Sequence, residues 1–407
     1  MKNSKKTIFR FFISLLFVFS CSAMRPPIVL KTGESSQQQR LCLQTKPIMP
    51  DVPQISRSSS SDTLLVRTAQ PAQITAQSSA PIFWVERPLL PIYHQETKII
   101  FSIDGGGSRG IIPLFYTMEL MKRLRIPSLG PLVDMFAGTS VGALICAGIA
   151  LGQEASMFEN FHSLVERTFS KSKLSMKGVC KPLYKNSEKL KVIKEFTGER
   201  SARELGVDFI VPFFCYNTGE AMYYKSFSPS SEDFKLADLL MMTSSAPTFF
   251  NPYFCFSSDL KKYEGGDGGI FANHPGEEAY HLARSRYPFA KLVMISFGTG
   301  TCDKSAEFKY YENRGLIFWA ERLPHLFIAA ATDNTERSLV NLSQKDSNFH
   351  YHRIQLPLRS GNMSLDENSP EKLDLLISAA MANIGPTGFA YNPFSSALSA
   401  LQQKMQG

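Results

Sequence analysis

The sequence lacks the patterns that mark metal sites and membrane spans. Its seven cysteines include no C-x-x-C pair, so a structural zinc site is not indicated. No EF-hand calcium loop and no internal repeat is present. The mostly apolar run Phe11–Phe19 has nine residues, whereas a bilayer-spanning helix takes about 20. We therefore predict neither a metal ion nor another cofactor.

Net positive charge is almost absent outside the first fifty residues. The net charge is +8, but residues 1–50 alone carry eight Lys or Arg against one acid, Glu34, which gives +7. The rest of the chain is almost neutral and has no basic field of the kind that a nucleic-acid-binding protein needs. Nucleic acid is therefore not an expected partner.

Residues 1–23 have the pattern of a secretory signal peptide. Four basic residues precede the apolar run, and the small residues of "SCSA" follow it, so cleavage after Ala23 would fit. Cys21 also permits a lipoprotein signal, and an uncleaved anchor or an accidentally apolar N-terminus are the alternatives. We expect an exported or membrane-anchored protein, most simply a bacterial one.

The remaining chain divides by composition. Residues 24–97 form a Ser/Gln/Pro-rich arm that we predict to be disordered, because it has too little apolar surface to offset its ordering entropy. We predict a folded domain over residues 98–390, which is where the motifs described below lie, and a C-terminal tail over 391–407. Cys146, Cys215 and Cys255 lie in apolar runs and are expected to be free buried thiols. The six cysteines after Cys21 also allow disulfides, whose pairing the sequence does not define.

Short apolar strands alternate with helical patterns after residue 97. The expected strands are 98–103, 133–137, 208–217, 221–227, 291–297 and 349–355. The expected helices are 111–124, 141–152, 235–246, 276–287, 326–344 and 369–384. This alternation predicts an α/β layered domain with a largely parallel, buried central sheet flanked by helices.

The stretch "SIDGGGSRG" at 102–110 follows the first strand and precedes a helix. Gly105, Gly107 and Gly110 satisfy the dinucleotide fingerprint, but Asp134, the acid it would require, stands at the start rather than the end of the next strand. A P-loop is excluded, because Ile111 follows Gly110 where lysine is required. A tight turn with no ligand is a further interpretation.

The same loop could hold a transient oxyanion. Successive N–H groups of Gly105–Gly107 at a helix N-terminus stabilise negative charge on oxygen as well as phosphate. Arg109 would add a positive charge nearby, or form a salt bridge with Asp104 or a neighbouring loop.

A second glycine-framed stretch, "GTSVG" at Gly138–Gly142, matches the G-x-S-x-G nucleophile elbow. Its position between an apolar segment and a helix is the context in which a strained turn projects a serine, here Ser140. The helix that begins at Val141 directs its positive dipole end at this site.

The serine needs a base, and no histidine after Ser140 lies in a glycine-framed turn. These histidines are His162, His274, His281, His325, His350 and His352. An acid, in contrast, lies in such a glycine-framed turn. The stretch "GGDGG" places two glycines on each side of Asp267, which implies close backbone approach. A plain turn or a cation-binding loop is the alternative.

Taken together, "DGGGSRG", "GTSVG", "SSAPTFF" and "GGDGG" resemble the patatin-like phospholipase family, as do "MISFGTG" and "YHRIQ" further on. The resemblance covers residues 98–384 and implies that family's modified α/β-hydrolase fold. It implies Ser140 as nucleophile, Asp267 as proton acceptor, and Gly105, Gly106, Gly107 and Arg109 as the oxyanion-stabilising loop. The other motif glycines are Gly110, Gly138, Gly142, Gly268 and Gly269.

The family implies a mechanism and a substrate class. Ser140 would attack an acyl ester while Asp267 takes its proton, and water would then hydrolyse the acyl-enzyme. Membrane phospholipids or other acyl lipids would be the substrate, and the need for a protein activator stays open. We predict the five aromatics of 248–256 as ordinary core, with an acyl-chain wall as the alternative.

Three other functions compete with this lipid acyl hydrolase. They are a non-enzymatic lipid- or partner-binding module, an α/β-hydrolase with a Ser140–Asp267–His triad, and a Rossmann-type NAD protein. The intact Ser140 and Asp267 count against the binding module, which would not need both.

Replacing both His350 and His352 by Ala separates a dyad from a triad. With a dyad, fatty-acid release by the variant stays within a few-fold of the unmodified chain. A fall of about 10⁴-fold, as when a triad residue is lost, would establish a histidine base.

Overall fold

The computed structural model describes residues 96–170, 182–229, 232–302, 315–358 and 364–406. All of them belong to one compact unit, Pro88–Gly407. The expected signal peptide with Cys21, and the arm up to residue 95, lie outside the described residues.

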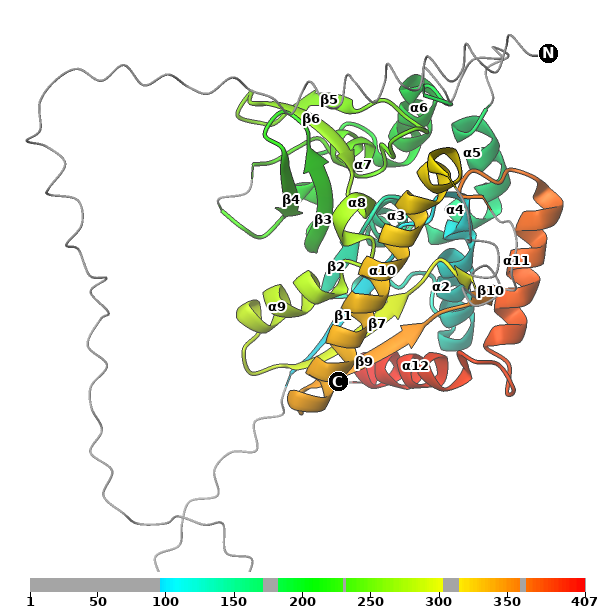
Figure 1. The fold of residues 1–407 in the computed structure, drawn as a ribbon. Helices are drawn as coiled ribbons and strands as arrows, with labels where there is room; N and C mark the ends of the chain where they lie inside the picture. The colour runs from blue at the N-terminus through cyan, green and yellow to red at the C-terminus, as the bar shows by residue number, and fades with distance from the viewer. Residues whose placement is uncertain (1–95, 171–181, 230–231, 303–314, 359–363, 407) are drawn as a thin grey trace, which may run out of the picture. The chain divides into compact units, whose positions relative to one another are not determined.

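The described chain is built on an eight-stranded mixed sheet with the order β5-β6-β3-β2-β1-β7-β9, in which β4 also pairs with β3 (Figure 1). The strands are β1 Thr97–Ile103, β2 Met135–Gly138, β3 Asp208–Cys215, β4 Glu220–Lys225, β5 Tyr253–Phe256, β6 Lys262–Asp267, β7 Lys291–Phe297 and β9 Phe349–Ile354. A separate two-stranded parallel sheet joins β8 Thr301–Cys302 to β10 Pro357–Leu358.

The centre of the large sheet is parallel. β1 pairs with β2 on one side and β7 on the other, and the register places Ile103 beside both Gly138 and Phe297. The carboxyl ends of these three strands therefore meet at one edge of the sheet, where open α/β sheets carry their ligand sites. The antiparallel pairs β3–β6 and β5–β6 extend the sheet beyond β3.

Both faces of the sheet are buried. Along β1, Ile99, Phe101 and Ile103 belong to a core cluster on one face, and Ile100 belongs to a second cluster on the other. This alternation follows from the two-residue period of a strand. It explains why the parallel strands are continuous apolar runs in the sequence.

Helices cover the two faces unequally (Figure 1). The larger cluster receives side chains from α2 Ile111–Leu124, α3 Val141–Ala150, α4 Glu154–Glu159, α5 Phe161–Thr168, α6 Asn186–Thr197, α7 Leu236–Thr243, α11 Pro370–Asn383 and α12 Tyr391–Gln406. The smaller cluster receives side chains from α9 Gly276–Arg286 and α10 Leu316–Lys345. The short elements are α8 Gly269–Ala272, η1 Gly107–Gly110, η2 Gly130–Leu132 and η3 Arg203–Leu205.

The predicted fold class is confirmed: a largely parallel central sheet is flanked by helices on both sides. α2 has the bounds expected from the sequence, and α3 ends at Ala150, just before Gly152, whose φ is +67°. The β5–β6 pair and helices α4, α5 and α6 were not predicted. Residues 391–406, expected as a tail, form α12, and Phe394, Ala397 and Leu401 of this helix are buried in the larger core cluster.

Two further findings concern the cysteines and membrane spans. Cys146, Cys215 and Cys255 are free and buried, which confirms the expectation for these three. Within the described ranges, no helix has the length and hydropathy needed to cross a bilayer.

We expect Phe394→Ala to destabilise the domain, because Phe394 is fully buried and packs 6.3 Å from the Tyr116 ring, centroid to centroid. Truncating such a side chain costs about 3–5 kcal/mol in free energy of unfolding. Met405→Ala, at a half-exposed position of the same helix, should change it by less than about 0.5 kcal/mol. Denaturant titration measures both, and equal effects would show that α12 is not part of the core.

Candidate active site

Ser140 lies at the turn between β2 and α3, in a conformation that non-glycine residues rarely adopt. Its φ is 54° and its ψ is −125°. Such strain costs of order 1–3 kcal/mol and persists only where the surroundings enforce it. Here they do: a Cβ on Gly142 would overlap the carbonyl oxygen of Ile103, and one on Gly138 would lie 2.6 Å from Cα of Ala143. Both flanking glycines are therefore required for the close packing of this turn.

Asp267 is the last residue of β6, and its carboxyl group is buried beside the serine. Ser140 and Asp267 line the same cavity, and the N–H of Gly269 donates to Oδ1 of Asp267 at 2.7 Å. Burial raises the pKa of Asp267 to about 6, against the lowering effect of the Gly269 N–H, the Ser140 hydroxyl and the Lys189 charge. The structure thus brings together the two residues that the motifs singled out.

The glycine loop runs directly past Ser140. A Cβ on Gly105 would be 3.4 Å from Cβ of Ser140, and one on Gly107, whose φ is +58°, would overlap the Leu365 carbonyl. The N–H of Gly105 already donates to the Asn273 carbonyl at 3.1 Å. Among the described residues, the N–H groups of Gly106 and Gly107 have no acceptor. These two N–H groups, rather than that of Gly105, are therefore the ones available to an anion.

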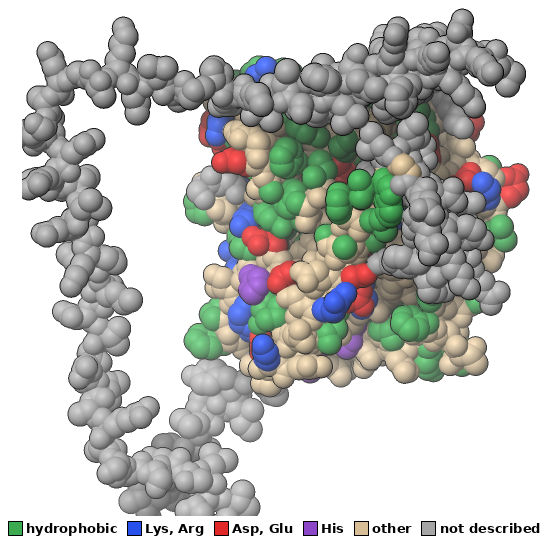
Figure 2. Space-filling model, viewed as in Figure 1, with side chains coloured by type: hydrophobic (Ala, Val, Ile, Leu, Met, Phe, Trp, Pro, Cys, Tyr) green, Lys and Arg blue, Asp and Glu red, His purple; other side chains and the backbone are tan. Residues whose placement is uncertain are grey.

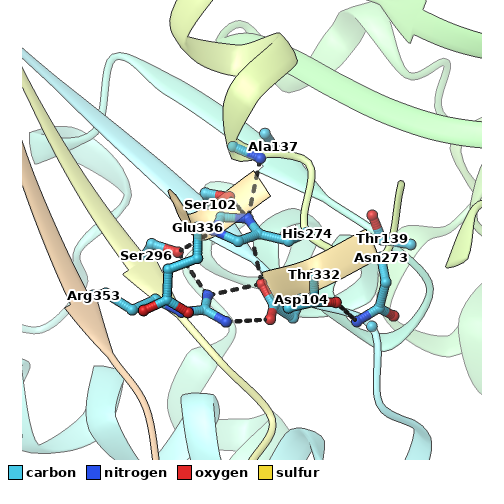
Figure 3. Close-up of polar contacts among 12 residues, drawn as sticks. Ser102, Asp104, Ala137, Thr139, Asn273, His274, Ser296, Thr332, Glu336 and Arg353 are labelled. Carbon is cyan, nitrogen blue, oxygen red and sulfur yellow. Dashed lines mark hydrogen bonds and ion pairs between the residues drawn. The ribbon is translucent and has the colours of Figure 1, made fainter. Parts of the chain in front are cut away.

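A buried ion pair anchors the start of the loop. Arg353 of β9 donates to both carboxylate oxygens of Asp104, at 2.9 and 2.6 Å, and to Ser296 at 2.8 Å (Figure 3). His274 lies against the same carboxylate, with 3.6 Å between Nδ1 and Oδ1. Arg109 was one expected partner of Asp104, and the structure shows Arg353 in this role. Arg109 lines the cavity beside the glycine loop.

The segment Thr243–Ser245, at the end of α7, joins the two halves of the site. Thr243 Oγ1 accepts the N–H of Ser140 at 3.1 Å and donates to the Pro212 carbonyl at 2.6 Å. The carbonyls of Thr243 and Ser245 accept the N–H groups of Gly268 and Asp267. One short segment therefore bonds to the backbone of both the serine turn and the acid turn.

Lys189 of α6 is a buried cation in the same place. Its Nζ donates to the Ser244 carbonyl at 2.8 Å and to Ser245 Oγ at 3.3 Å, and lies 4.0 Å from the centroid of the Phe250 ring. Burial lowers its pKa to about 7, and the Asp267 charge opposes this shift.

A cavity of about 630 Å³ opens at the serine. Its polar end contains Ser140, Asp267, Lys189 and the glycine loop. Apolar side chains of α3, α4, α5 and α6 and of the segment after α7 line the rest: Val141, Leu144, Ile145, Met157, Phe161, Leu164, Val165, Val192, Ile193, Phe196, Phe249 and Phe250. Exposed Ile270 and Phe327 lie on α8 and α10, which also contribute lining residues. Figure 2 shows hydrophobic side chains gathered on this face of the molecule, where Figure 1 places α8 and α10.

The predicted core role of the 248–256 aromatics holds only in part. Phe249 and Phe250 line the cavity, as the acyl-wall alternative required. Tyr253 donates to Asp238 at 2.7 Å, and Phe254 and Phe256 are 46% and 52% exposed.

No histidine is among the described residues that line the cavity. His274 lies against Asp104, and burial lowers its pKa to about 3, so it is neutral. His350 and His352 lie on β9, and the pKa of each is lowered by burial. The side chain of His325 lies outside the described residues.

The acid that a nucleotide site would need lies at the wrong edge of the sheet. Asp134 precedes β2 and accepts the N–H of Ile99 at 2.8 Å, next to Lys98 and Lys404 at the amino ends of the strands. The glycine loop follows their carboxyl ends. In the described part of the chain, no cluster of His, Cys, Asp or Glu could hold a metal ion.

The fold and the site define an α/β protein with a serine elbow, an acid turn and an open glycine loop. Residues 101–280 match the family model described as Patatin-like phospholipase. This matched stretch, which contains Ser140 and Asp267, is similar to that family.

Curated relatives agree with the family. The chain is 30% identical over 193 residues to the "cGAMP-activated phospholipase" of Escherichia coli, covering 43% of this chain and 53% of that protein. It is 27% identical over 220 residues to the protein of the same name in Vibrio cholerae, covering 47% and 61%. It is 26% identical over 340 residues to "Patatin-like protein 2" of Arabidopsis thaliana, covering 71% and 83%. The chain thus spans just over half of the first of these relatives.

Three parts of the site were not predicted from the sequence. Ser244 and Ser245 begin the motif "SSAPTFF", and Thr243 ends the helix before it. The motif was recognised, but the hydrogen bonds of these residues cannot be read from the sequence. Lys189, in a lysine-rich amphipathic helix, carries no signal that separates it from Lys191 or Lys194. Arg353, within "YHRIQ", lies 249 positions from Asp104 in the chain.

Thr243→Val tests the bond to the serine turn. The change keeps the side-chain shape but leaves the Ser140 N–H and the Pro212 carbonyl without their partner, at a cost of about 1–3 kcal/mol in free energy of unfolding. Thr117→Val is the matched control, because that buried hydroxyl donates only to the Leu114 carbonyl of its own helix. If denaturant titration gives both variants the same stability, Thr243 does not support the turn.

Proposed function

We propose that this protein is a lipid acyl hydrolase of the phospholipase A or lysophospholipase type, with Ser140 as nucleophile and Asp267 as base. The observation that carries this proposal is that Ser140 and the buried Asp267 carboxyl lie together at the polar end of a largely apolar cavity, where the serine hydroxyl helps to lower the pKa of the acid. The family and the names of the curated relatives support the same class of activity.

The reaction follows from the positions of these groups. Ser140 Oγ bonds to the ester carbonyl carbon as its proton passes to Asp267, and the N–H groups of Gly106 and Gly107 bind the developing oxyanion. The tetrahedral intermediate collapses to an acyl-enzyme as the leaving alcohol takes the proton from Asp267. Water, deprotonated by Asp267, then releases the fatty acid and restores Ser140.

The raised pKa of Asp267 suits it to this role. A carboxylate with an ordinary pKa near 4 is a weak base at neutral pH, whereas one with a pKa of about 6 remains ionised there and accepts a proton more readily. An oxyanion donor of the kind formed by Gly106 and Gly107 contributes about 3–4 kcal/mol to the lowering of the barrier.

The cavity supports an acyl-lipid substrate. Its walls are aliphatic and aromatic, and a volume of about 630 Å³ is in the range of pockets that enclose a small ligand. The reacting ester would lie at Ser140 and the acyl chain among the α3, α5 and α6 side chains.

The binding-module alternative is disfavoured by strain at Ser140. A positive φ at a serine, enforced by two glycines, costs stability that a protein with no use for the serine hydroxyl need not spend. The triad alternative is disfavoured because the described cavity lining contains no histidine.

We also propose that the chain is exported or membrane-anchored. The proposal depends on the signal-peptide pattern of residues 1–23, and N-terminal sequencing of the protein from a bacterial host tests it. A start after Ala23 supports cleavage, a lipid on Cys21 supports the lipoprotein form, and an intact N-terminus in the cytoplasm contradicts export.

The central test is fatty-acid release from mixed phospholipid vesicles by the full chain. We expect Ser140→Ala and Asp267→Asn each to lose nearly all activity, while exposed Ser163→Ala and Asp259→Asn retain it. In the unmodified chain, kcat/KM should fall as the pH drops below about 6, because protonated Asp267 cannot act as base.

Two outcomes would contradict the proposal. Full activity of Asp267→Asn would place the base elsewhere. A folded, inert unmodified chain, tested with and without cGAMP because two relatives are named for activation by it, would favour the binding module.

A further inference from the structure

Lys189 is a charged side chain where an apolar one would be expected. It is only 3% exposed and lies on α6 just before Val192 and Ile193, which line the same cavity. Lys191 and Lys194 of this helix are instead solvent-accessible and paired with glutamates. Lysines are almost never fully buried unless they are paired, because removing the ammonium group from water is costly. Its burial therefore calls for a compensating role.

The partners of Lys189 are neutral. The ammonium group donates to the Ser244 carbonyl and to Ser245 Oγ, and the face of the Phe250 ring is 4.0 Å away. No described carboxylate lies within 4.0 Å of Nζ. Asp267, which lines the same cavity, is the acid whose charge acts on it.

The contacts lead directly to the proposed base. Ser245, held by Lys189 through its hydroxyl, accepts the backbone N–H of Asp267 at 3.1 Å. Ser244 and Ser245 are fixed from the other side by bonds to the Leu240 and Met241 carbonyls. Lys189 thus braces the segment that fixes the Asp267 backbone, and its charge faces the cavity into which the Asp267 carboxyl points.

We propose that Lys189 is a positioning residue for the acyl-transfer reaction, which holds the Ser244–Ser245 segment in place and keeps the Asp267 carboxyl ionised. This inference rests on the proposed function and assigns to it a residue outside its motifs. Lys189 does not touch the reacting atoms in this role; it acts through Ser245 and through its charge.

The groups around Asp267 determine in which direction its pKa would move if Lys189 were lost. Asp267 is faced by the Ser140 hydroxyl, the Gly269 N–H, Lys189 and Tyr216, whose own pKa the Asp267 charge helps to raise. Lys189 is the only cation among them, so its loss should raise the pKa of Asp267 further, toward the value that burial alone would impose. The base would then be protonated over more of the neutral range.

The test compares Lys189→Met and Lys189→Gln with the full unmodified chain. Methionine removes both charge and hydrogen bonds, whereas glutamine keeps donors for Ser244 and Ser245 but no charge. Lys191→Met is the matched control on the exposed face of α6. The readouts are the pH profile of kcat/KM on a soluble short-chain ester and the rate at which a fluorophosphonate labels Ser140.

We expect the acid limb to move to higher pH by about one unit in both Lys189 variants, which lowers the rate about tenfold below that limb. At pH values above the acid limb, kcat/KM of Lys189→Gln should be close to that of the unmodified chain, because glutamine again donates hydrogen bonds to Ser244 and Ser245. Lys191→Met should match the unmodified chain. An unshifted acid limb in Lys189→Gln would overturn the electrostatic role, and an unchanged plateau in Lys189→Met would overturn the brace.

Folding and function are separated by two additional measurements. If circular dichroism shows that Lys189→Met is unfolded, the shift in Lys189→Gln decides alone. If the unmodified chain neither hydrolyses nor is labelled, the proposed function fails. The carboxyl titration of ¹³C-aspartate-labelled protein, with Asp267 assigned by Asp267→Asn, then still reveals whether Lys189→Gln raises the Asp267 pKa.

Discussion

The carbonyl oxygen of Ile103 occupies the space that a side chain on residue 142 would need, and the rest of the site depends on this contact. The start of α3 lies directly against the end of β1. Ser140, which connects β2 with this helix, therefore adopts a positive φ. Because β1 and β2 are parallel neighbours, the glycine loop after β1 then passes so near the serine that a Cβ on Gly105 would be 3.4 Å from Cβ of Ser140. The two glycine-framed stretches are consequently parts of one site.

This constraint explains what the sequence could and could not predict. Close backbone approach excludes every residue but glycine at positions 138 and 142, so Gly138 and Gly142 mark the site in the sequence without knowledge of any partner. Asp267 is marked in the same way, by Gly268, whose Cβ would overlap the Pro212 carbonyl. The apolar strand runs likewise predict the parallel sheet, since burial on both faces leaves no other pattern.

Contacts between distant segments leave no comparable mark. Lys189 and Ser244 are 55 positions apart, and Thr243 and Ser140 are 103 apart; each side chain is of a type that is common on exposed helices. α12 was missed because its buried Phe394, Ala397 and Leu401 are too few to distinguish its pattern from that of a polar tail. The β5–β6 pair was missed because its outward-facing Phe254 and Phe256 obscure the usual alternation of apolar and polar residues.

The two buried acids of the site show how the local environment gives similar residues different roles. Asp104 is bound at both oxygens by Arg353, an arrangement that fixes its geometry. Asp267 lies beside the neutral Gly269 N–H and Ser140 hydroxyl, while the Lys189 ammonium donates to Ser244 and Ser245, and burial raises the pKa of Asp267. The apolar walls that would accommodate an acyl chain are also what raises this pKa and lowers that of Lys189. An acyl chain that fills the cavity would expel water and so strengthen every charge interaction within it. Substrate binding and activation of the base would therefore depend on the same apolar walls.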